Sequence, residues 1–253
     1  MTPAGRGELC RCRDAEGVCE ESARRFAGLA AEALRARGRF SVALSGGATP
    51  RRLHEILAAP PFRDAVDWAR VEFFQGDERG VPPDHADSNW GMACRTLLDP
   101  VGAPAERRHR MEAERADRDA AARDYERELA GVLGEGKDGA PPRLDLVLLG
   151  MGDDAHTASL FPGADALGER RRWVVPARSP RPPHERLTLT FPMIDRARCV
   201  LFLVAGAAKA EPLAAVLEGP SDPERLPSQR VAPTDGALLW IVDEAAAARL
   251  AKS

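Results

Sequence analysis

The chain has 253 residues, of which 44% are apolar and 30% charged, and its formal net charge is −3. This composition is that of a globular protein, and a mildly acidic chain lacks the basic surface that nucleic-acid binding requires. No apolar run approaches the roughly 20 residues of a membrane-spanning helix, and residues 1–13 contain no apolar stretch that would act as a secretory signal. We therefore expect a cytoplasmic protein with no membrane or nucleic-acid partner, either a monomer or a small homo-oligomer.

Helical and strand-like spacings of apolar residues alternate along the chain. Gly38 ends the first helical pattern, and Ser88 is placed to cap the third. The expected helices cover residues 20–37, 51–58, 89–98, 115–133 (polar enough to lie on the surface) and 209–217, with an alanine-rich helix at the C-terminus. The expected strands cover residues 40–44, 71–75, 144–149, 173–176, 186–191, 199–205 and 237–242.

The strand over residues 144–149 indicates which kind of sheet these elements form. Its last four residues are apolar without a break, which is typical of a parallel strand buried on both faces. Strands that alternate with helices predict a single-domain, Rossmann-like α/β fold, with a mostly parallel sheet and helices on both faces. No linker-like segment divides the chain, so we expect one domain over residues 1–253.

Glycine-rich or charged turns end four of the expected strands, after residues 44, 75, 149 and 205. In open α/β sheets, ligands bind outside the carboxyl ends of the strands. The sequence therefore predicts a site at this edge of the sheet, formed by side chains from these turns.

The first of these turns reads SGGATP and begins at Ser45. Gly46 and Gly47 allow the backbone to approach a ligand closely, and Thr49 before Pro50 is placed to cap the following helix. The free amides at the start of that helix suit an anion. The turn lacks the GK[ST] ending of a Walker loop and is not the dinucleotide GxGxxG pattern, so a plain strand-to-helix turn is the alternative.

Cationic side chains at the strand boundaries are candidates for phosphate binding. Arg79 follows the strand over residues 71–75, Arg186 begins another strand, and Lys209 lies just beyond a third. Asp77 is placed to accept a hydrogen bond from a ligand hydroxyl or to position Arg79. Taken one at a time, each of these charges is more simply explained as a solvated surface group.

His156 stands in a glycine-flanked turn just after the buried strand over residues 144–149, and Asp153 and Asp154 precede it. Histidine exchanges a proton near neutral pH, which makes His156 a candidate general base, with Asp154 to orient it. A lone histidine is more often structural, so the position at a strand end is what favours catalysis. His85, in a loop with two prolines, is the rival candidate.

The five cysteines are scattered and odd in number, which argues against a set of disulfides. Cys10, Cys12 and Cys19 lie near one another in the sequence, but they form no CxxC pair and have no nearby histidine to complete a zinc site. We expect ordinary thiols there and no metal ion.

Several segments resemble the 6-phosphogluconolactonase family, in the family's order, from about residue 40 to residue 247. They are SVALSGGATP (41–50), VEFFQGDERGVPPDHADSN (71–89), LDLVLLGMGDDAHTASLFPG (144–163), RLTLTFPMID (186–195), AGAAKAEPL (205–213) and PTDGALLWIVDEAAA (233–247). The block DAHTASLFP is the most specific of them. At Ala155 the family usually has glycine, so a positive φ at this position would strain the alanine.

The resemblance implies an enzyme that hydrolyses 6-phospho-D-glucono-1,5-lactone to 6-phosphogluconate in the oxidative pentose phosphate pathway, with no cofactor and no metal. It implies that His156 is the base. It also implies a substrate pocket lined by the turn from Ser45 to Thr49 and by Asp154, Arg79, Arg186 and Lys209.

Two other functions, that of a deaminase and that of a sugar-phosphate sensor, fit the sequence less well. A deaminase that resembles glucosamine-6-phosphate deaminase would have HIAFNEP where this chain has HTASLFP, so Phe161 replaces the acidic residue of that motif. A non-catalytic sugar-phosphate sensor would usually carry a DNA-binding helix-turn-helix. Only about 39 residues precede the first expected strand, too few for that module and the helix over residues 20–37.

Overall fold

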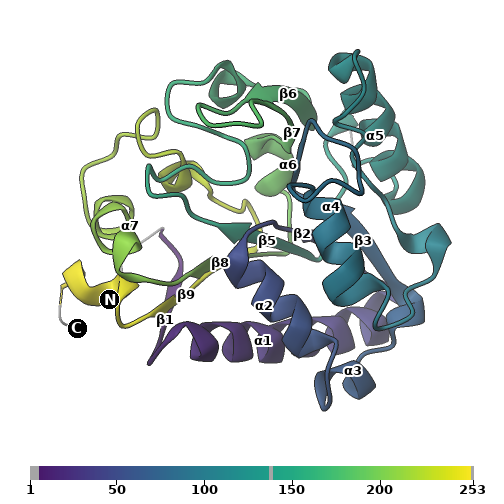
Figure 1. Ribbon diagram of the computed structural model, residues 1–253, viewed down its shortest axis with the longest axis horizontal. Coiled ribbons are helices and arrows are strands. Elements are labelled where there is room, and N and C mark those ends of the chain that lie inside the picture. The colour runs from purple at the N-terminus through teal and green to yellow at the C-terminus, as the bar shows by residue number, and fades with distance from the viewer. Residues whose placement is uncertain (1–5, 137–138, 252–253) are drawn as a thin grey trace.

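The computed structural model describes residues 6–136 and 139–251 and contains a six-stranded sheet with a three-stranded sheet beside it (Figure 1). The larger sheet has the order β1-β9-β8-β5-β2-β3, and every neighbouring pair is parallel. Its strands are β1 (Glu8–Cys12), β2 (Phe40–Leu44), β3 (Val71–Gln75), β5 (Leu146–Gly150), β8 (Cys199–Val204) and β9 (Ala237–Asp243). The predicted α/β fold with a mostly parallel sheet is confirmed.

The helices are α1 (Ala15–Arg37), α2 (Ala48–Leu57), α3 (Phe62–Ala65), α4 (Asn89–Ala93), α5 (Arg118–Leu133), α6 (Phe191–Ile194) and α7 (Ala210–Leu217). A π-helical turn, Cys94–Leu98, continues α4. Single 3-10 turns lie at Trp68–Arg70, Ala105–Arg107, Asp165–Gly168, Ala207–Lys209, Pro227–Arg230 and Ala246–Arg249. Among the described residues, no helix is long and apolar enough to cross a membrane.

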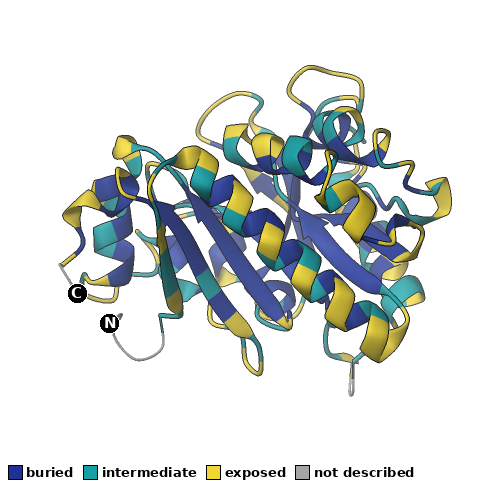
Figure 2. Ribbon diagram, turned by 90° about the horizontal axis from the view of Figure 1, so that it is seen from below, coloured by how far each residue is buried: buried dark blue, intermediate teal, exposed yellow. Residues whose placement is uncertain are grey.

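Helices cover both faces of the parallel sheet, and successive side chains of each strand belong to different cores. Val42 and Leu148 pack in the core that α1 and α2 complete on one face. Ala43 and Leu149 pack in the core that α5 and α7 complete on the other. Figure 2 shows the buried strands with α1 across them and its exposed residues facing outward. The unbroken apolar run in β5 is therefore explained by burial on both faces.

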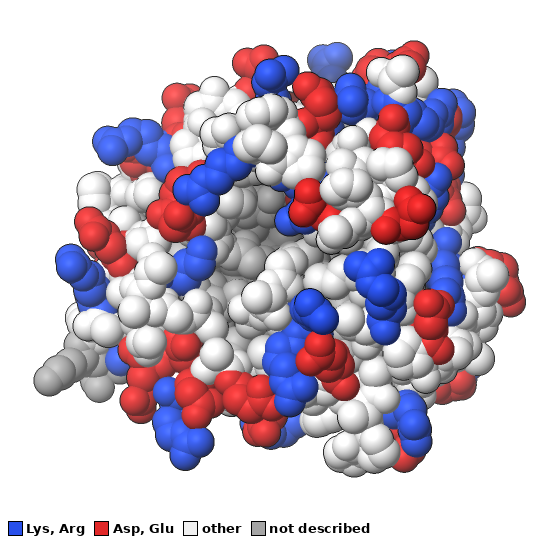
Figure 3. Space-filling model, viewed as in Figure 1, with Lys and Arg blue, Asp and Glu red and all other residues white. Residues whose placement is uncertain are grey.

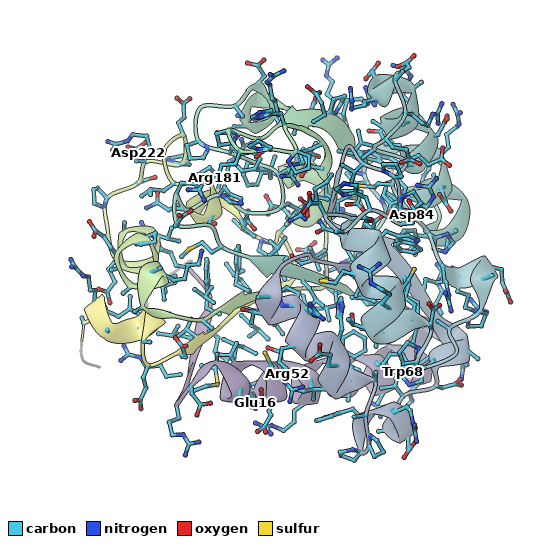
Figure 4. The ribbon with its side chains drawn as sticks, viewed as in Figure 1. Glu16, Arg52, Trp68, Asp84, Arg181 and Asp222 are labelled. Carbon is cyan, nitrogen blue, oxygen red and sulfur yellow. The ribbon has the colours of Figure 1, made fainter. Side chains whose placement is uncertain are left out.

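The ends of α1 follow from its capping residues. The side chain of Asp14 accepts a hydrogen bond from the Gly17 amide at 2.9 Å, and Gly38 ends the helix with a φ of 76°. The helix therefore begins at Ala15, earlier than the expected residue 20. Figure 4 shows α2 beside α1, where Arg52 of α2 donates two hydrogen bonds to Glu16 of α1.

The second sheet is the main departure from the prediction. It is antiparallel and has the order β4-β7-β6, with β4 at Asp77–Arg79, β6 at Val174–Arg178 and β7 at Glu185–Leu189. From its sequence, Asp77–Arg79 is expected only as a turn. The other two strands are expected, but the sequence pattern does not separate them from the parallel sheet. Six residues connect β6 to β7, fewer than the dozen or so that a parallel crossover needs, so the two form a hairpin.

Three other expectations are corrected. β1 is absent from the prediction because Glu8 and Arg11 make this short edge strand polar, as edge strands often are. The C-terminal helix is one 3-10 turn, Ala246–Arg249. The helix expected over residues 115–133 begins at Arg118, and it is not wholly a surface helix, because Tyr125 and Leu129 are buried.

A buried histidine joins α5 to the parallel sheet. His109 is 5% exposed and packs against Phe74 of β3 with 4.5 Å between ring centroids. Its Nε2 lies 3.0 Å from an oxygen of Glu72 on β3, and its Nδ1 lies 2.8 Å from an oxygen of Glu128 on α5. Burial alone would lower the pKa of His109, but the hydrogen bonds that its ring donates to Glu128 and Glu72, and the charges of these two carboxylates, outweigh burial and raise the pKa above its ordinary value.

This raised pKa predicts a stability that decreases with pH. The contribution of His109 is fully present below its unfolded-state pKa and is lost as pH rises through the folded-state pKa. We expect the free energy of unfolding of the wild type, relative to His109→Gln, to decrease by about 1 kcal/mol from pH 6 to pH 9. Urea denaturation measures it. The control is His85→Gln, since His85 is exposed; a constant difference for His109→Gln would refute the expectation.

Candidate active site

The turns that follow β2, β3, β5 and β8 lie at the carboxyl edge of the parallel sheet, as expected for a ligand site in an open α/β fold. The space-filling view shows that the molecule is hollowed on the face of Figure 1, with basic and acidic side chains around the hollow (Figure 3). The contacts described below connect these turns to one another and to the antiparallel sheet.

His156 and Asp154 form a close pair in the turn after β5. The Nδ1 of His156 lies 2.5 Å from an oxygen of Asp154, and the same oxygen accepts the His156 amide at 3.1 Å. The ring of Phe161 packs against the imidazole, with 4.4 Å between centroids. Both polar side chains are partly exposed, at 28% for His156 and 36% for Asp154. The pair is therefore fixed in orientation and still reachable by a ligand.

The protonation of Asp154 determines which nitrogen of His156 is free. Burial raises the pKa of Asp154, but the hydrogen bond and charge of His156 and two backbone amides outweigh it and lower the pKa to about 2. An ionised carboxylate can only accept a hydrogen bond, so Nδ1 must carry the proton. In the neutral imidazole, Nε2 is then the nitrogen with a free lone pair.

Ala155, between these two residues, has the positive φ that the sequence comparison with the family brought into question. Its φ is 62°, and its side chain is fully buried in the core. Its carbonyl accepts hydrogen bonds from both the amide (3.0 Å) and the hydroxyl (2.8 Å) of Ser228. The strain of a left-handed alanine, about 1–2 kcal/mol, is opposed by these two bonds and by burial of the methyl group.

We expect Ala155→Gly to be nearly neutral, because relief of the backbone strain offsets the loss of a buried methyl worth about 0.8 kcal/mol. Ala155→Val should lower the free energy of unfolding by more than about 2 kcal/mol, since a β-branched residue is a genuine outlier at positive φ and overfills the core. Denaturant unfolding of the three proteins compares them. If valine were tolerated as well as glycine, the backbone at this position would not be left-handed in solution.

Arg79 and Arg186 are directly opposite each other on β4 and β7. Arg186 is 7% exposed, no hydrogen bond is described for its guanidinium, and its Nε is shielded from solvent. Burial lowers the pKa of Arg186, Asp77 opposes the shift, and Arg79 adds to it. Arg79 donates to the Asp87 carbonyl at 2.6 Å. Like charges opposite each other destabilise a sheet, so this pair concentrates positive charge between β4 and β7 that no carboxylate among the described residues pairs with directly.

Asp77 connects three of the turns. It accepts a hydrogen bond from the hydroxyl of Ser159 at 2.6 Å, and its backbone carbonyl accepts one from the Asn89 side chain at 3.1 Å. The Asn89 amide in turn lies against Gly46, where an added Cβ would be 1.8 Å from its Oδ1. Gly46 is therefore required by the close approach of the Asn89 side chain, and Asp77 has a structural role in joining these turns.

Glu78 is a structural centre of the site that the sequence analysis did not single out. It is 2% exposed and lies between Asp77 and Arg79. Its carboxylate accepts hydrogen bonds from the side chains of Gln75 and Ser88 and from the backbone amides of Arg79, Asn89 and Trp90. Ser88 itself caps α4, as predicted, by accepting the Gly91 amide at 3.0 Å. The sequence shows both the charged segment that begins at Asp77 and the capping residue Ser88. It does not show that Glu78 and Ser88 are in contact.

The turn after β2 differs from the prediction in one detail. Thr49 does not cap α2: the helix begins at Ala48, and the capping position is Gly47, with a φ of 106°. Thr49 lies in the first turn, where its carbonyl accepts a weak hydrogen bond from the Cys19 thiol at 3.5 Å. Glycine is needed at the capping position because a φ of 106° is a backbone conformation that residues with a side chain rarely adopt. Ser45 makes only a local hydrogen bond, to the Gly46 carbonyl.

Lys209 lies at the start of α7, and its charge reaches the turn that holds His156. The pKa of Asp153 is lowered by a hydrogen bond from Arg181 and by the charges of Arg181 and Lys209. Arg181, labelled in Figure 4, is 76% exposed and lies 3.2 Å from an oxygen of Asp153. The side chain of His85 contacts Asp87 of its own loop, and no hydrogen bond or ion pair among the described residues joins it to His156 or Asp154.

Metal ligands are not gathered anywhere in the described part of the chain: residues 6–136 and 139–251 contain no group of three or more His, Cys, Asp or Glu side chains able to hold an ion. All five cysteines are free thiols. Burial raises the pKa of Cys19 to about 11, as expected for an inert buried thiol.

The chain matches the model of the glucosamine-6-phosphate isomerase/6-phosphogluconolactonase family over residues 13–240. It is 42% identical to 6-phosphogluconolactonase of Synechocystis sp. over 219 residues, which cover 87% of this chain and 88% of that protein. It is 44% identical to 6-phosphogluconolactonase of Nostoc sp. over 218 residues, or 86% of this chain and 88% of that one. The structure of 6-phosphogluconolactonase from Trypanosoma cruzi superposes with a TM-score of 0.87 at 30% identity, covering 99% of both chains.

The fold and the family model together define an α/β protein of the sugar-phosphate isomerase and lactonase type. The chain belongs to the glucosamine-6-phosphate isomerase/6-phosphogluconolactonase family. The relatives described above carry the name 6-phosphogluconolactonase.

Proposed function

We propose that this chain is a 6-phosphogluconolactonase, an enzyme that hydrolyses 6-phospho-D-glucono-1,5-lactone to 6-phospho-D-gluconate in the oxidative pentose phosphate pathway. The names of its relatives support the reaction. The observation that carries the mechanism is the His156 imidazole, held by an ionised Asp154 with Nε2 free.

In this mechanism, Nε2 of His156 takes a proton from a water molecule, and the resulting hydroxide adds to the lactone carbonyl carbon. The tetrahedral oxyanion then collapses, the bond from that carbon to the ring oxygen breaks, and the imidazolium returns its proton to the departing alkoxide. Asp154 stabilises the imidazolium between the two steps, because its negative charge lies against Nδ1. The carboxylic acid product ionises at neutral pH, so no other reactant is needed.

Arg79, Arg186 and Lys209 are proposed to bind the phosphate and stabilise the oxyanion. The two arginines adjoin across β4 and β7, and the guanidinium of Arg186 has no described partner within the protein. A buried, unpaired guanidinium gains most from a ligand with two acceptor oxygens. We propose that the turn from Ser45 to Thr49 supplies backbone amides beside them, with Gly47 as the residue that opens the helix start.

The structural surroundings favour water over a protein nucleophile. The hydroxyl of Ser159 donates to Asp77 and not to His156, so the nucleophile–base contact of a serine hydrolase is not formed there. Phe161 packs on the imidazole where the deaminase motif has an acidic residue, and a phenyl ring cannot transfer protons. A sensor without catalysis would bind the product yet leave the decay rate of the lactone unchanged.

His156→Asn tests the base. Asparagine keeps a similar size but cannot take a proton, so we expect kcat to fall by about 10²–10⁴-fold with little change in substrate affinity. Lactone loss is followed with the substrate generated by glucose-6-phosphate dehydrogenase, and spontaneous hydrolysis is subtracted at each pH. The wild-type kcat/KM should increase with pH through one ionisation that the variant lacks.

The control for that experiment is His85→Asn, which should keep the wild-type rate because His85 is exposed and, among the described residues, its side chain bonds only to Asp87 of its own loop. If His156→Asn kept most of the wild-type activity, His156 would not be the base, and His85 would be the next candidate. Loss in both would indicate that the variants disturb the fold, which circular dichroism would detect.

Arg186→Gln tests phosphate recognition. Loss of a charge-assisted hydrogen bond should weaken binding of the phosphorylated lactone by roughly 1–3 kcal/mol, while turnover of unphosphorylated glucono-1,5-lactone should change much less. The ratio of kcat/KM for the two substrates is the measurement. Arg178→Gln is the matched control, because Arg178 lies on the neighbouring strand, is 75% exposed and pairs with Glu185. Equal losses on both substrates would mean that Arg186 does not bind the phosphate.

A further inference from the structure

Arginines gather at the opposite edge of the parallel sheet from the candidate active site. Arg37 ends α1, Arg39 directly precedes β2, and Arg198 directly precedes β8. Arg143 and Arg196 join them from the segments before β5 and β8. This is the amino edge of the strands, whereas the turns that hold His156 and Lys209 lie at the carboxyl edge. A five-residue strand separates the two edges by roughly 17 Å.

These arginines line one cavity with a volume of about 200 Å³. Its lining, among the described residues, includes five arginines and two acidic residues, Asp145 and Glu135. The whole chain carries a formal charge of −3, so positive charge is concentrated here against the overall balance. A volume below the 300 Å³ or so of drug-sized ligand pockets suits a small ion rather than a nucleotide.

Asp145 is already fully engaged by the protein. It accepts hydrogen bonds from the amide (2.9 Å) and hydroxyl (3.0 Å) of Ser41, and it pairs with Arg37 at 2.8 Å and Arg198 at 3.3 Å. Two guanidinium groups thus share one carboxylate. Burial lowers the pKa of Arg198, and repulsion from Arg37 and Arg143 lowers it further. The cavity therefore holds more positive charge than its own acidic groups neutralise.

The other three arginines have no carboxylate partner among residues 6–136 and 139–251. Arg39 donates to the carbonyls of Val132 and Leu133 at the end of α5, and Arg143 donates to the Asp235 carbonyl at 2.7 Å. No hydrogen bond is described for Arg196. The Nε atoms of Arg143 and Arg196 are shielded from solvent and reach no acceptor in the described chain. Shielded donors without acceptors are unfavourable unless a ligand or water supplies the acceptor.

We propose that this arginine cavity is a second anion site that binds a small multivalent oxyanion, of the size of inorganic phosphate or pyrophosphate. The guanidinium fork matches pairs of phosphate oxygens, which is why arginine is preferred for such ligands. The site is separate from the proposed lactonase site, because no residue of the cavity belongs to the turns at the carboxyl edge. An anion there stabilises the amino ends of β2, β5 and β8 by neutralising the side chains that repel one another.

Calorimetric titration with inorganic pyrophosphate tests the proposal. The titrations use an Arg186→Gln background to weaken binding at the candidate active site. Arg196→Gln, which breaks no described hydrogen bond, should raise the Kd at least about tenfold, and the double variant Arg143→Gln/Arg196→Gln should remove the site. Binding should weaken as sodium chloride is raised, since exposed charges are screened. The control is Arg225→Gln/Arg249→Gln, which removes two exposed charges elsewhere and should leave the Kd unchanged.

An unchanged Kd in the Arg196→Gln protein would overturn the proposal, as would an equal loss in the control. Arg196→Gln in the otherwise wild-type chain should keep the full kcat/KM on the phosphorylated lactone. That measurement separates the two proposals: the protein can prove inactive as a lactonase and still bind pyrophosphate here, or the reverse.

Discussion

Every strand in the middle of the six-stranded sheet has to bury both of its faces, and this constraint decides where polar chemistry can be placed. Side chains along β2 and β5 alternate between two dry cores, so neither face has room for a ligand. Charged groups are displaced to the ends of the strands, where the backbone leaves the sheet. The carboxyl edge carries His156, Arg79 and Lys209, and the amino edge carries Asp145 and its arginines.

Buried carboxylates make these two edges rigid. Removing a carboxylate from water is costly unless its oxygens find donors, and here each one does. Glu78 is enclosed by amides of α4 and of its own strand, and Asp145 by Ser41 and two arginines. Because an unpaired acid could not remain in these positions, each carboxylate fixes the segments that surround it. Asp154 acts in the same way at the surface of the site, where its hydrogen bond with Nδ1 fixes the orientation of the His156 imidazole.

The sequence predicted the parts of this molecule that depend on local pattern. Strands β2 and β3 were placed to the residue, because their apolar runs are bounded by Gly38, Ser45 and Gly76. The turn that holds His156 was found for the same reason. Contacts between distant segments were not predictable: nothing in the local sequence indicates that Asp77–Arg79 pairs with β7, that Glu78 accepts the amides of α4, or that Ser228 reaches Ala155. The prediction that Thr49 caps α2 failed because Gly47, with its positive φ, starts the helix two residues earlier than a cap at Thr49 would.

The two hydrogen bonds that Ser228 donates to the Ala155 carbonyl have a consequence for the order in which this turn is completed during synthesis. Ser228 lies 73 residues further along the chain than the carbonyl it holds. Because the N-terminal part of a chain leaves the ribosome first, His156 and Asp154 emerge well before the residue that fixes the peptide between them. A nascent or truncated chain that ends ahead of Ser228 would contain every proposed catalytic group, yet its left-handed turn would be unsupported. The peptide between the two proposed catalytic residues therefore gains this support only when the segment that carries Ser228 has folded against it.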